Sequence, residues 1–230
     1  MSAFKPVVLC ILDGWGLRAE TEANAPVLAD TPTFDRIMAT CPNARLITHG
    51  PDVGLPTGQM GNSEVGHTNI GAGRVVAMDL GQIDLAIEDG SFARSPAILA
   101  FVEALKKSGG TAHLMGVISD GGVHGHIDHV VAAADAITAL GVPVVIHAVT
   151  DGRDVAPTSA KSFIDDLQSR LPEGATIATV IGRYFALDRD NRWDRVQTAY
   201  DAMVLGQGGQ AATAAAAVQA ATDGGTTDEF

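Results

Sequence analysis

The sequence predicts an α/β fold in which a parallel sheet carries helices on both faces. Two observations predict it. Short apolar runs alternate along the 230 residues with longer segments whose apolar side chains recur at helical spacing. Each apolar run also stops at charged or polar residues, and in parallel α/β sheets the carboxyl ends of the strands open onto one ligand-binding edge.

The first apolar run covers residues 6–12 and ends at Asp13, so we expect a strand buried on both faces. Asp13 is then either a metal ligand at the strand end or a turn residue before the following glycine. Thr31 and Pro32 predict the N-cap and first turn of a helix. Residues 44–48 are expected to form a short strand.

Residues 59–74 contain four glycines and one serine among polar groups, with few bulky apolar residues. Glycine lets a backbone approach a ligand closely. If a helix begins near Ser63, its free N–H groups favour an anion there, which suits a serine that carries a phosphate. The alternative is a glycine-rich turn capped by Asn62 or Ser63.

The regular part of the chain begins later. Strands are expected at residues 112–118, 143–149 and 176–181, and helices at residues 91–108, 128–140, 158–171 and 191–205. Residues 206–225 are rich in alanine and glycine and would hold the final helix. Asp120 and His124 follow the first of these strands, Arg153 and Asp154 the second, and Arg183 the third. Because these ends share one edge, we expect a functional site there.

The chemistry of that edge combines an acid/base pair, His124 and Asp154, with the fixed positive charges of Arg153 and Arg183. Guanidinium groups bind phosphate and carboxylate through two parallel hydrogen bonds. We therefore expect a small anionic ligand, and we expect Arg189, in the loop of residues 182–190, to contact it.

Other charged and imidazole side chains receive a structural interpretation. Arg192 and Arg195 are interpreted as the solvated face of a helix. His126 and His129 are interpreted as residues that cap or flank a helix, with metal ligation alongside the histidine at the strand edge as the alternative. His113 and His147 lie inside predicted strands and are interpreted as structural. His67 could be a ligand or a structural residue, and nothing around His49 indicates a function.

Composition excludes several classes of protein. The net charge of -12 argues against a nucleic-acid partner, which needs a positive face. Cys10 and Cys41 lack metal-binding spacing, which is typical of a reduced cytoplasmic protein without structural zinc. We see no signal peptide, no run of ~20 apolar residues that would cross a membrane, and no P-loop motif for nucleotides.

Five motifs resemble the cofactor-independent (2,3-bisphosphoglycerate-independent) phosphoglycerate mutases, and they occur in the order of that family. They are Leu12-Asp13-Gly14-Trp15-Gly16, Gly61-Asn62-Ser63-Glu64-Val65-Gly66-His67, Ser119-Asp120-Gly121-Gly122-Val123-His124, Asp151-Gly152-Arg153-Asp154, and the run from Gly182-Arg183-Tyr184 to Arg195. The segment Thr227-Asp228-Glu229-Phe230 also looks like a family segment. Gly125 is a departure, because the family commonly has serine there.

The resemblance implies a two-domain architecture of which this is the N-terminal part. Residues 1–76 would be the first portion of an alkaline-phosphatase-like metal domain, and residues 77–230 most of a phosphotransferase domain inserted into it. Without the remainder of the metal domain, residues 1–76 would expose apolar strand edges, so we expect poor stability or aggregation of the isolated chain.

The resemblance also implies an activity. It is the glycolytic and gluconeogenic interconversion of 3-phosphoglycerate and 2-phosphoglycerate, independent of bisphosphoglycerate and proceeding through a phosphoserine. The cofactor would be Mn²⁺, two ions in the complete enzyme, with Mg²⁺ or another divalent ion as the alternative. Such an enzyme is expected to be cytoplasmic and monomeric when complete, with no membrane or nucleic-acid partner.

By the same resemblance the site residues receive roles. Asp13 and Ser63 match metal ligands, Ser63 and Asp154 match catalytic residues, and the substrate-binding positions are His124, Arg153, Asp154, Arg183 and Arg189. The remaining metal ligands of the family would lie beyond this chain.

Two competing interpretations stay open. One is a metal-dependent phosphohydrolase or phosphopentomutase of the alkaline phosphatase superfamily, which should lack the His124 and Arg183 motifs together. The other is a truncated, inactive fragment that at most binds phosphoglycerate.

Overall fold

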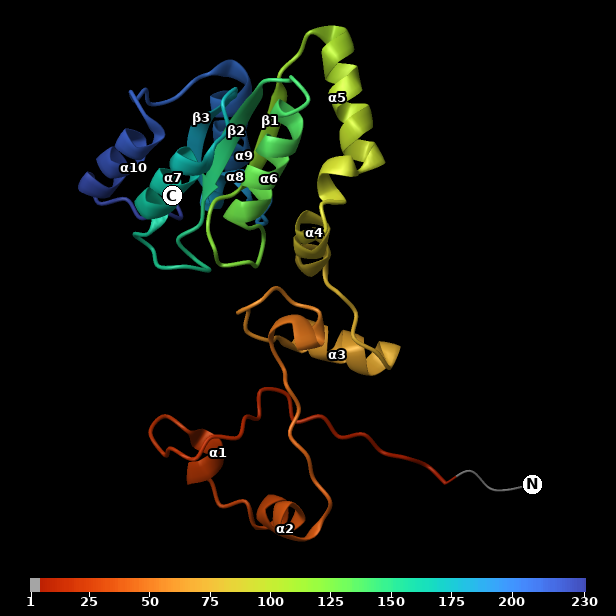
Figure 1. Ribbon diagram of the computed structural model, residues 1–230. Helices are drawn as coiled ribbons and strands as arrows, with labels where there is room; N and C mark the ends of the chain where they lie inside the picture. Colours follow the sequence, from red (N-terminus) through yellow and green to blue (C-terminus); the bar gives the residue numbers. More distant parts are fainter. Residues whose placement is uncertain (1–4) are drawn as a thin grey trace.

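The computed structural model describes residues 5–230 (Figure 1). Its α-helices are α1 (Ala25–Leu28), α2 (Pro32–Thr40), α3 (Ser63–Ala72), α4 (Asp79–Glu88), α5 (Pro96–Ser108), α6 (Ile127–Thr138), α7 (Ala160–Arg170), α8 (Arg183–Ala186), α9 (Trp193–Tyr200) and α10 (Ala214–Asp223). The strands are β1 (Ala112–Val117), β2 (Val144–Thr150) and β3 (Ala175–Gly182). Short 3-10 turns occur at Gly50–Val53 and Phe92–Arg94, and one π-helical turn at Asp201–Leu205.

The three strands form a parallel sheet in the order β1-β2-β3, which confirms the α/β class. Ala112 of β1 lies opposite Val144 of β2, and Val144 lies opposite Ala175 of β3. Each strand lies within about a residue of the range expected from its apolar run. The register shifts once, between Ile146 and His147 of β2.

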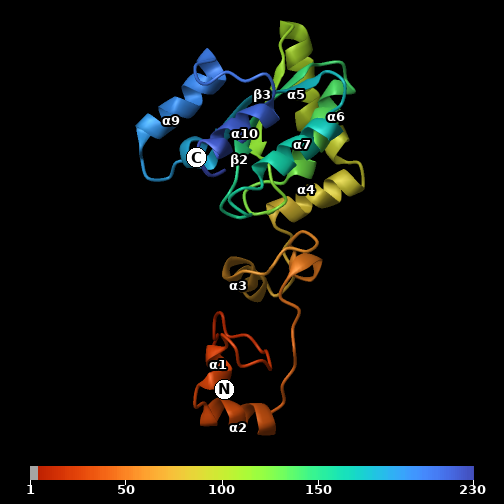
Figure 2. The same cartoon turned by 90° about the vertical axis from the view of Figure 1, so that its left-hand side faces the viewer.

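Helices cover both faces of the sheet. Figures 1 and 2 show α6 and α7 on one face and α8 and α9 on the other. The core lies between the sheet and the first pair, where Ile118, Ile146, Ile164 and Leu167 are fully buried. Helix α10 packs against α7 and β3, and its Val218 belongs to the same core.

The prediction of a buried strand at residues 6–12 is wrong for the described structure. These residues form no strand, and Val7 and Val8 are 94% and 86% exposed. The short strand expected at residues 44–48 is also absent, with Leu46 exposed. A strand needs a neighbour to pair its backbone groups, and residues 5–78 supply none to either segment.

Several helix boundaries differ from expectation. The helix expected at residues 91–108 is interrupted before Pro96, because the residue that precedes a proline disfavours helical geometry. Helix α4 has no counterpart in the predicted elements. Near Ser63 the expected helix is present: the Asn62 side chain caps it by accepting a hydrogen bond from the Val65 backbone N–H at 3.0 Å.

The carboxyl edge of the sheet faces the segment that carries α3 (Figure 1). Gln59, in that segment, donates a hydrogen bond from its side-chain amide to the carbonyl of Gly122, in the loop after β1. Farther along, His129 of α6 and Asp84 of α4 form a 2.6 Å hydrogen bond. No helix within residues 5–230 has the length and apolar character to cross a membrane.

Candidate functional site

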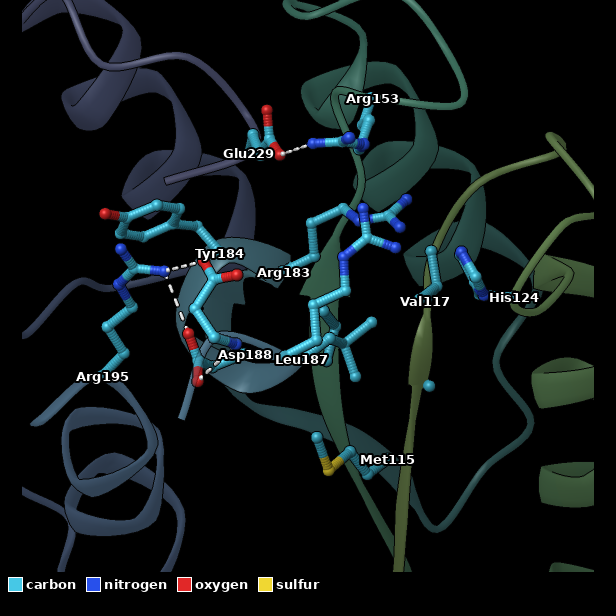
Figure 3. A pocket seen from close by; sticks show the side chains of 14 residues that line it. Met115, Val117, His124, Arg153, Arg183, Tyr184, Leu187, Asp188, Arg195 and Glu229 are labelled. Carbon is cyan, nitrogen blue, oxygen red and sulfur yellow. Dashed lines mark hydrogen bonds and ion pairs between the residues drawn. The ribbon is translucent and has the colours of Figure 1, made fainter. Parts of the chain in front are cut away.

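A cavity of about 560 Å³ opens where the three strands end (Figure 3). Four of the five side chains expected to bind substrate line it: His124, Arg153, Arg183 and Arg189. They come from the loop after β1, the loop after β2, the first residue of α8 and the loop between α8 and α9. The edge predicted from the strand ends is therefore one continuous, arginine-rich cavity.

The fifth side chain, Asp154, is hydrogen bonded to Arg183. Arg183 Nη1 donates to Asp154 Oδ2 at 2.5 Å and to Asp151 Oδ1 at 2.6 Å. His124 Nε2 lies 3.9 Å from the same Asp154 oxygen. The expected acid/base pair is thus adjacent, and Arg183 joins it to a second carboxylate that sequence reasoning assigned no role.

Asp151 is the buried anchor of this network, with a side chain only 3% exposed. Burial opposes its ionisation, but hydrogen bonds from the backbone N–H of Asp154, the Ser119 hydroxyl and Arg183 outweigh burial and lower the pKa of Asp151. Ser119 Oγ donates to Asp151 Oδ2 at 2.7 Å. The pKa of Arg183 is raised: burial acts to lower it, and Asp154 and Asp151 overcome that effect. The guanidinium is therefore fixed in place before any ligand binds.

The C-terminal segment of residues 226–230 reaches the rim of the cavity. Asp228 Oδ2 accepts the backbone N–H of Ala160 at 2.7 Å at the start of α7. The carbonyl of Glu229 accepts the N–H of Tyr184 at 2.9 Å, and its carboxylate accepts from Arg153 Nη1 at 3.2 Å. The contact with Glu229 orients Arg153, one of the predicted substrate-binding residues. Local sequence patterns do not reveal it, because 76 residues separate the two.

Gly182 makes room for that segment. A Cβ added there would lie 2.6 Å from the carbonyl carbons of both Glu229 and Phe230. Real Cβ atoms do not approach so closely, so the end of β3 requires glycine for packing rather than for an unusual backbone angle.

The interpretation of Arg195 as a solvated residue is wrong. Its guanidinium lies 3.8 Å from the centroid of the Tyr184 ring and pairs with Asp188 and Asp190 (Figure 3). It also lines the cavity. Arg192, by contrast, is exposed, and within residues 5–230 its side chain pairs only with Asp194, as expected for a solvated face.

Asp13 and Ser63, the predicted metal ligands, meet outside this cavity. Ser63 Oγ donates a 2.6 Å hydrogen bond to Asp13 Oδ2 across 50 residues of chain. His67, one turn along α3, places Nδ1 3.2 Å from the same hydroxyl and 2.8 Å from the Ser63 carbonyl. Both partners are exposed, and Ser63 is the first residue of α3, where helix N–H groups attract anions.

Asp13 and Ser63 have the ligand chemistry of a divalent-cation site but not the full number of ligands. A carboxylate and a serine oxygen, 2.6 Å apart, are hard ligands of the kind that Mn²⁺ and Mg²⁺ bind. Within the part of the chain that the structure describes, no three His, Cys, Asp or Glu side chains gather as a ligand set. Asp13 and Ser63 therefore fit as two ligands of a cation and would need others.

The remaining histidines take structural positions. His126 caps α6 by accepting from the Asp128 N–H at 3.2 Å, as expected. His113 Nδ1 lies 2.9 Å from His147 Nε2, and His147 Nδ1 lies 2.9 Å from Thr179 Oγ1, so one ladder crosses all three strands. Burial, and then the neighbouring His113, lower the pKa of His147.

Residues 83–230 match the family described as BPG-independent PGAM N-terminus. The chain is 74% identical over its whole length to a protein of Cereibacter sphaeroides (strain ATCC 17025 / ATH 2.4.3), and 73% identical to one of Dinoroseobacter shibae (strain DSM 16493 / NCIMB 14021 / DFL 12). Both relatives are named 2,3-bisphosphoglycerate-independent phosphoglycerate mutase. The chain covers 46% of each, so it spans about half the length of the curated relatives it matches.

A solved structure shares the fold. It is a crystal structure of Leishmania mexicana phosphoglycerate mutase at low cobalt concentration, and it superposes with a TM-score of 0.72 at 35% identity. The match covers 88% of this chain and 39% of that one. Cobalt, a divalent transition metal, is thus associated with that protein.

Proposed function

The chain belongs to the BPG-independent phosphoglycerate mutases, and from that premise we propose that it serves the metal-dependent interconversion of 3-phosphoglycerate and 2-phosphoglycerate. The observation that carries the proposal is the cavity lined by Arg153, Arg183, Arg189 and His124, with Asp154 bonded to Arg183 and 3.9 Å from His124. In this proposal residues 1–76 belong to the metal-binding domain and residues 77–230 to the phosphotransferase domain.

Binding follows from charge and hydrogen-bond geometry. Phosphoglycerate carries a phosphate and a carboxylate, and planar guanidinium groups bind both through paired hydrogen bonds. Arg183 is held by Asp151, and Arg153 by Glu229, so these two donors lose little freedom when the ligand arrives. Among the described residues Arg189 has no hydrogen bond or ion pair to a protein side chain, which leaves its guanidinium for the ligand.

The proposed transfer uses Ser63 as nucleophile and Asp154 as proton carrier. The Ser63 hydroxyl first passes its proton to water, from which it recovers one at the end, and Asp154 starts in its protonated form. The Ser63 oxygen attacks phosphorus, the bond from phosphorus to the 3-oxygen breaks, and that oxygen takes the proton from Asp154. The glycerate then turns in the cavity. Asp154 removes the proton of the 2-hydroxyl, whose oxygen attacks the phosphoserine, and Ser63 is released and regains its proton.

Asp13 and Ser63 would hold the divalent cation, Mn²⁺ in our proposal. When bound, such an ion neutralises phosphate charge and lowers the pKa of a coordinated hydroxyl. Transfer also requires the Ser63 oxygen to reach phosphorus held in the cavity. Helix α3 lies beyond the carboxyl edge of the sheet (Figure 1), and His124, Arg153 and Arg183 of the cavity follow the strands at that edge.

A second candidate function is binding of phosphoglycerate without turnover. It is favoured because, within residues 5–230, the candidate metal ligands are limited to the Asp13–Ser63 pair, which is too few to hold a cation alone. The cavity residues do not depend on that set, so ligand binding by this chain needs no cation.

The test is the interconversion of 3- and 2-phosphoglycerate by the purified 230-residue chain, with Mn²⁺ and without bisphosphoglycerate, beside calorimetric titration with 3-phosphoglycerate. Ser63→Ala should abolish turnover, whereas Ser169→Ala, an exposed serine on α7, should not. Turnover that survives Ser63→Ala would rule out the phosphoserine route. Saturable binding without turnover supports the second candidate, and a folded chain that neither binds nor reacts overturns both.

A further inference from the structure

We propose that Arg195 is a positioning residue that holds the loop of residues 187–190 so that Arg189 faces the cavity. The role of Arg189 as a ligand to substrate rests on the proposed function. The role of Arg195 in ordering the loop rests on the geometry of the loop itself.

The first observation is a clamp around Arg189. Arg195 Nη1 lies 2.9 Å from Asp188 Oδ1 and 3.0 Å from Asp190 Oδ2. These carboxylates belong to the residues immediately before and after Arg189. One guanidinium therefore fixes both neighbours of Arg189 in sequence, while the Arg189 side chain lines the cavity.

The second observation is burial. The Arg195 side chain is 13% exposed and that of Asp188 only 1%. A carboxylate this deeply buried is stable only when a positive charge and hydrogen bonds compensate for lost water. Asp188 Oδ2 also accepts the backbone N–H groups of Asp190 and Arg192, at 3.2 and 2.8 Å, so its two oxygens are satisfied by the loop and by Arg195.

The third observation is the anchor of the clamp. The Arg195 guanidinium stacks 3.8 Å from the centroid of the Tyr184 ring, at the start of α8. Tyr184 is itself held by its backbone N–H bond to Glu229 and by ring contact with Phe230, at 4.6 Å between centroids. Figure 3 shows Arg195 reaching from α9 toward both Tyr184 and Asp188. The clamp thus connects the loop to the rigid end of the sheet.

The contacts of the Arg195 guanidinium are to the loop and to Tyr184, and these contacts distinguish it from Arg189. Its single positive charge already faces two carboxylates, whereas Arg189 has no such partner among the described side chains. Removing Arg195 would leave Asp188 buried and uncompensated. The loop must then open to let water reach that carboxylate, and Arg189 would lose its fixed position.

Arg192 provides a matched control. It lies three residues before Arg195, carries the same charge and is exposed, and its side chain pairs with Asp194 alone among the residues that the structure describes. Arg195→Met and Arg192→Met therefore remove the same charge and the same donors from neighbouring positions. Only the first breaks the clamp.

The first measurement is amide hydrogen exchange of the 230-residue chain. We expect the amides of residues 187–192 to exchange about tenfold faster or more in Arg195→Met, because the local opening free energy falls with the lost contacts to a charged group. Arg192→Met should match the wild type. Amides of β2 report whether each variant remains folded. Arg195→Lys keeps the charge but loses the bidentate guanidinium and its planar stacking on Tyr184, so its exchange rate at residues 187–192 should lie between those of the wild type and Arg195→Met.

The second measurement is calorimetric titration with 3-phosphoglycerate. Arg195→Met should weaken binding about tenfold or more, because a charge-assisted contact of Arg189 is displaced, and Arg192→Met should bind as the wild type does. If the wild type fails to bind, the proposed function is wrong, and exchange in the loop still decides the role of Arg195. Unchanged loop exchange in a folded Arg195→Met variant overturns the inference.

Discussion

The Ser63 hydroxyl donates a 2.6 Å hydrogen bond to the Asp13 carboxylate, although 50 residues separate them. The segment between them has no strand, and most of its apolar side chains are exposed, so this contact is not a by-product of core packing. It brings together two side-chain oxygens from the two motifs to which the family resemblance assigns metal ligands.

We expect Asp13→Asn to weaken Mn²⁺ binding by the chain about tenfold or more, because a neutral amide oxygen replaces the only carboxylate in contact with Ser63 among the described residues. Titration followed by electron paramagnetic resonance of free Mn²⁺ measures the change. Asp30→Asn, at an exposed position, is the control. Equal affinities for the two variants would contradict the assignment of Asp13.

Arg183→Met should lower the free energy of unfolding by about 3–5 kcal/mol, because it leaves the buried carboxylate of Asp151 without its positive partner. Urea denaturation measures this. Arg189→Met removes an equal charge from the same cavity without breaking a buried pair, and we expect it to change stability by about 0.5 kcal/mol or less. Similar losses in both variants would refute the anchoring role of Asp151.

The stability of the fold should fall as pH decreases below about 6.5, the ordinary pKa of histidine. The pKa of His147 is lowered in the folded chain, so over this range the unfolded chain binds a proton more readily than the folded one. The contribution of His147 to stability is fully present above the pKa that this residue has in the unfolded chain, and it is lost as pH falls toward the lower pKa of the folded chain. Denaturation at several pH values measures it.

The variant His147→Gln should show a weaker dependence of stability on pH across that range. His49→Gln, which alters a histidine outside the sheet with no hydrogen bond from its side chain among the described contacts, should retain the dependence of the wild type. An identical dependence in all three proteins would mean that the His113–His147–Thr179 ladder does not govern the effect.

Gly182→Ala should destabilise the chain by about 1–3 kcal/mol, because its Cβ would collide with the backbone of Glu229 and Phe230. Calorimetric melting compares it with Gly209→Ala, where an added Cβ meets nothing within 4 Å. If the two variants melt alike, the segment of residues 226–230 does not pack against β3 as described.

The strands of the sheet were predictable because their signal is local. Residues 112–118 and their counterparts are apolar runs flanked by helical segments, and the central strand β2 pairs with both of the others. Residues 6–12 carry an equally clear apolar signal, but a strand also depends on a neighbour, which no local pattern encodes. The apolar pattern therefore predicted a strand at residues 6–12 that the structure does not contain.

The site was predictable to the extent that it follows strand ends. His124 and Arg153 lie in the loops after β1 and β2, Arg183 directly follows β3, and the parallel arrangement brings them to one edge. Arg195 was misinterpreted because α9 carries exposed Trp193, so residue type did not indicate which side of the helix faces inward. The role of Glu229 depends on contact with Arg153 across 76 residues, which spacing cannot reveal.

The position of Phe230 makes this residue a suitable attachment point for an optical reporter. Its ring lies 4.6 Å from that of Tyr184, which lines the cavity. A dye attached through Phe230→Cys would sit beside Tyr184, which lines the cavity, and its emission should respond when an anion enters. Cys10 and Cys41 are exposed and would compete for the dye, so both must first be replaced by serine.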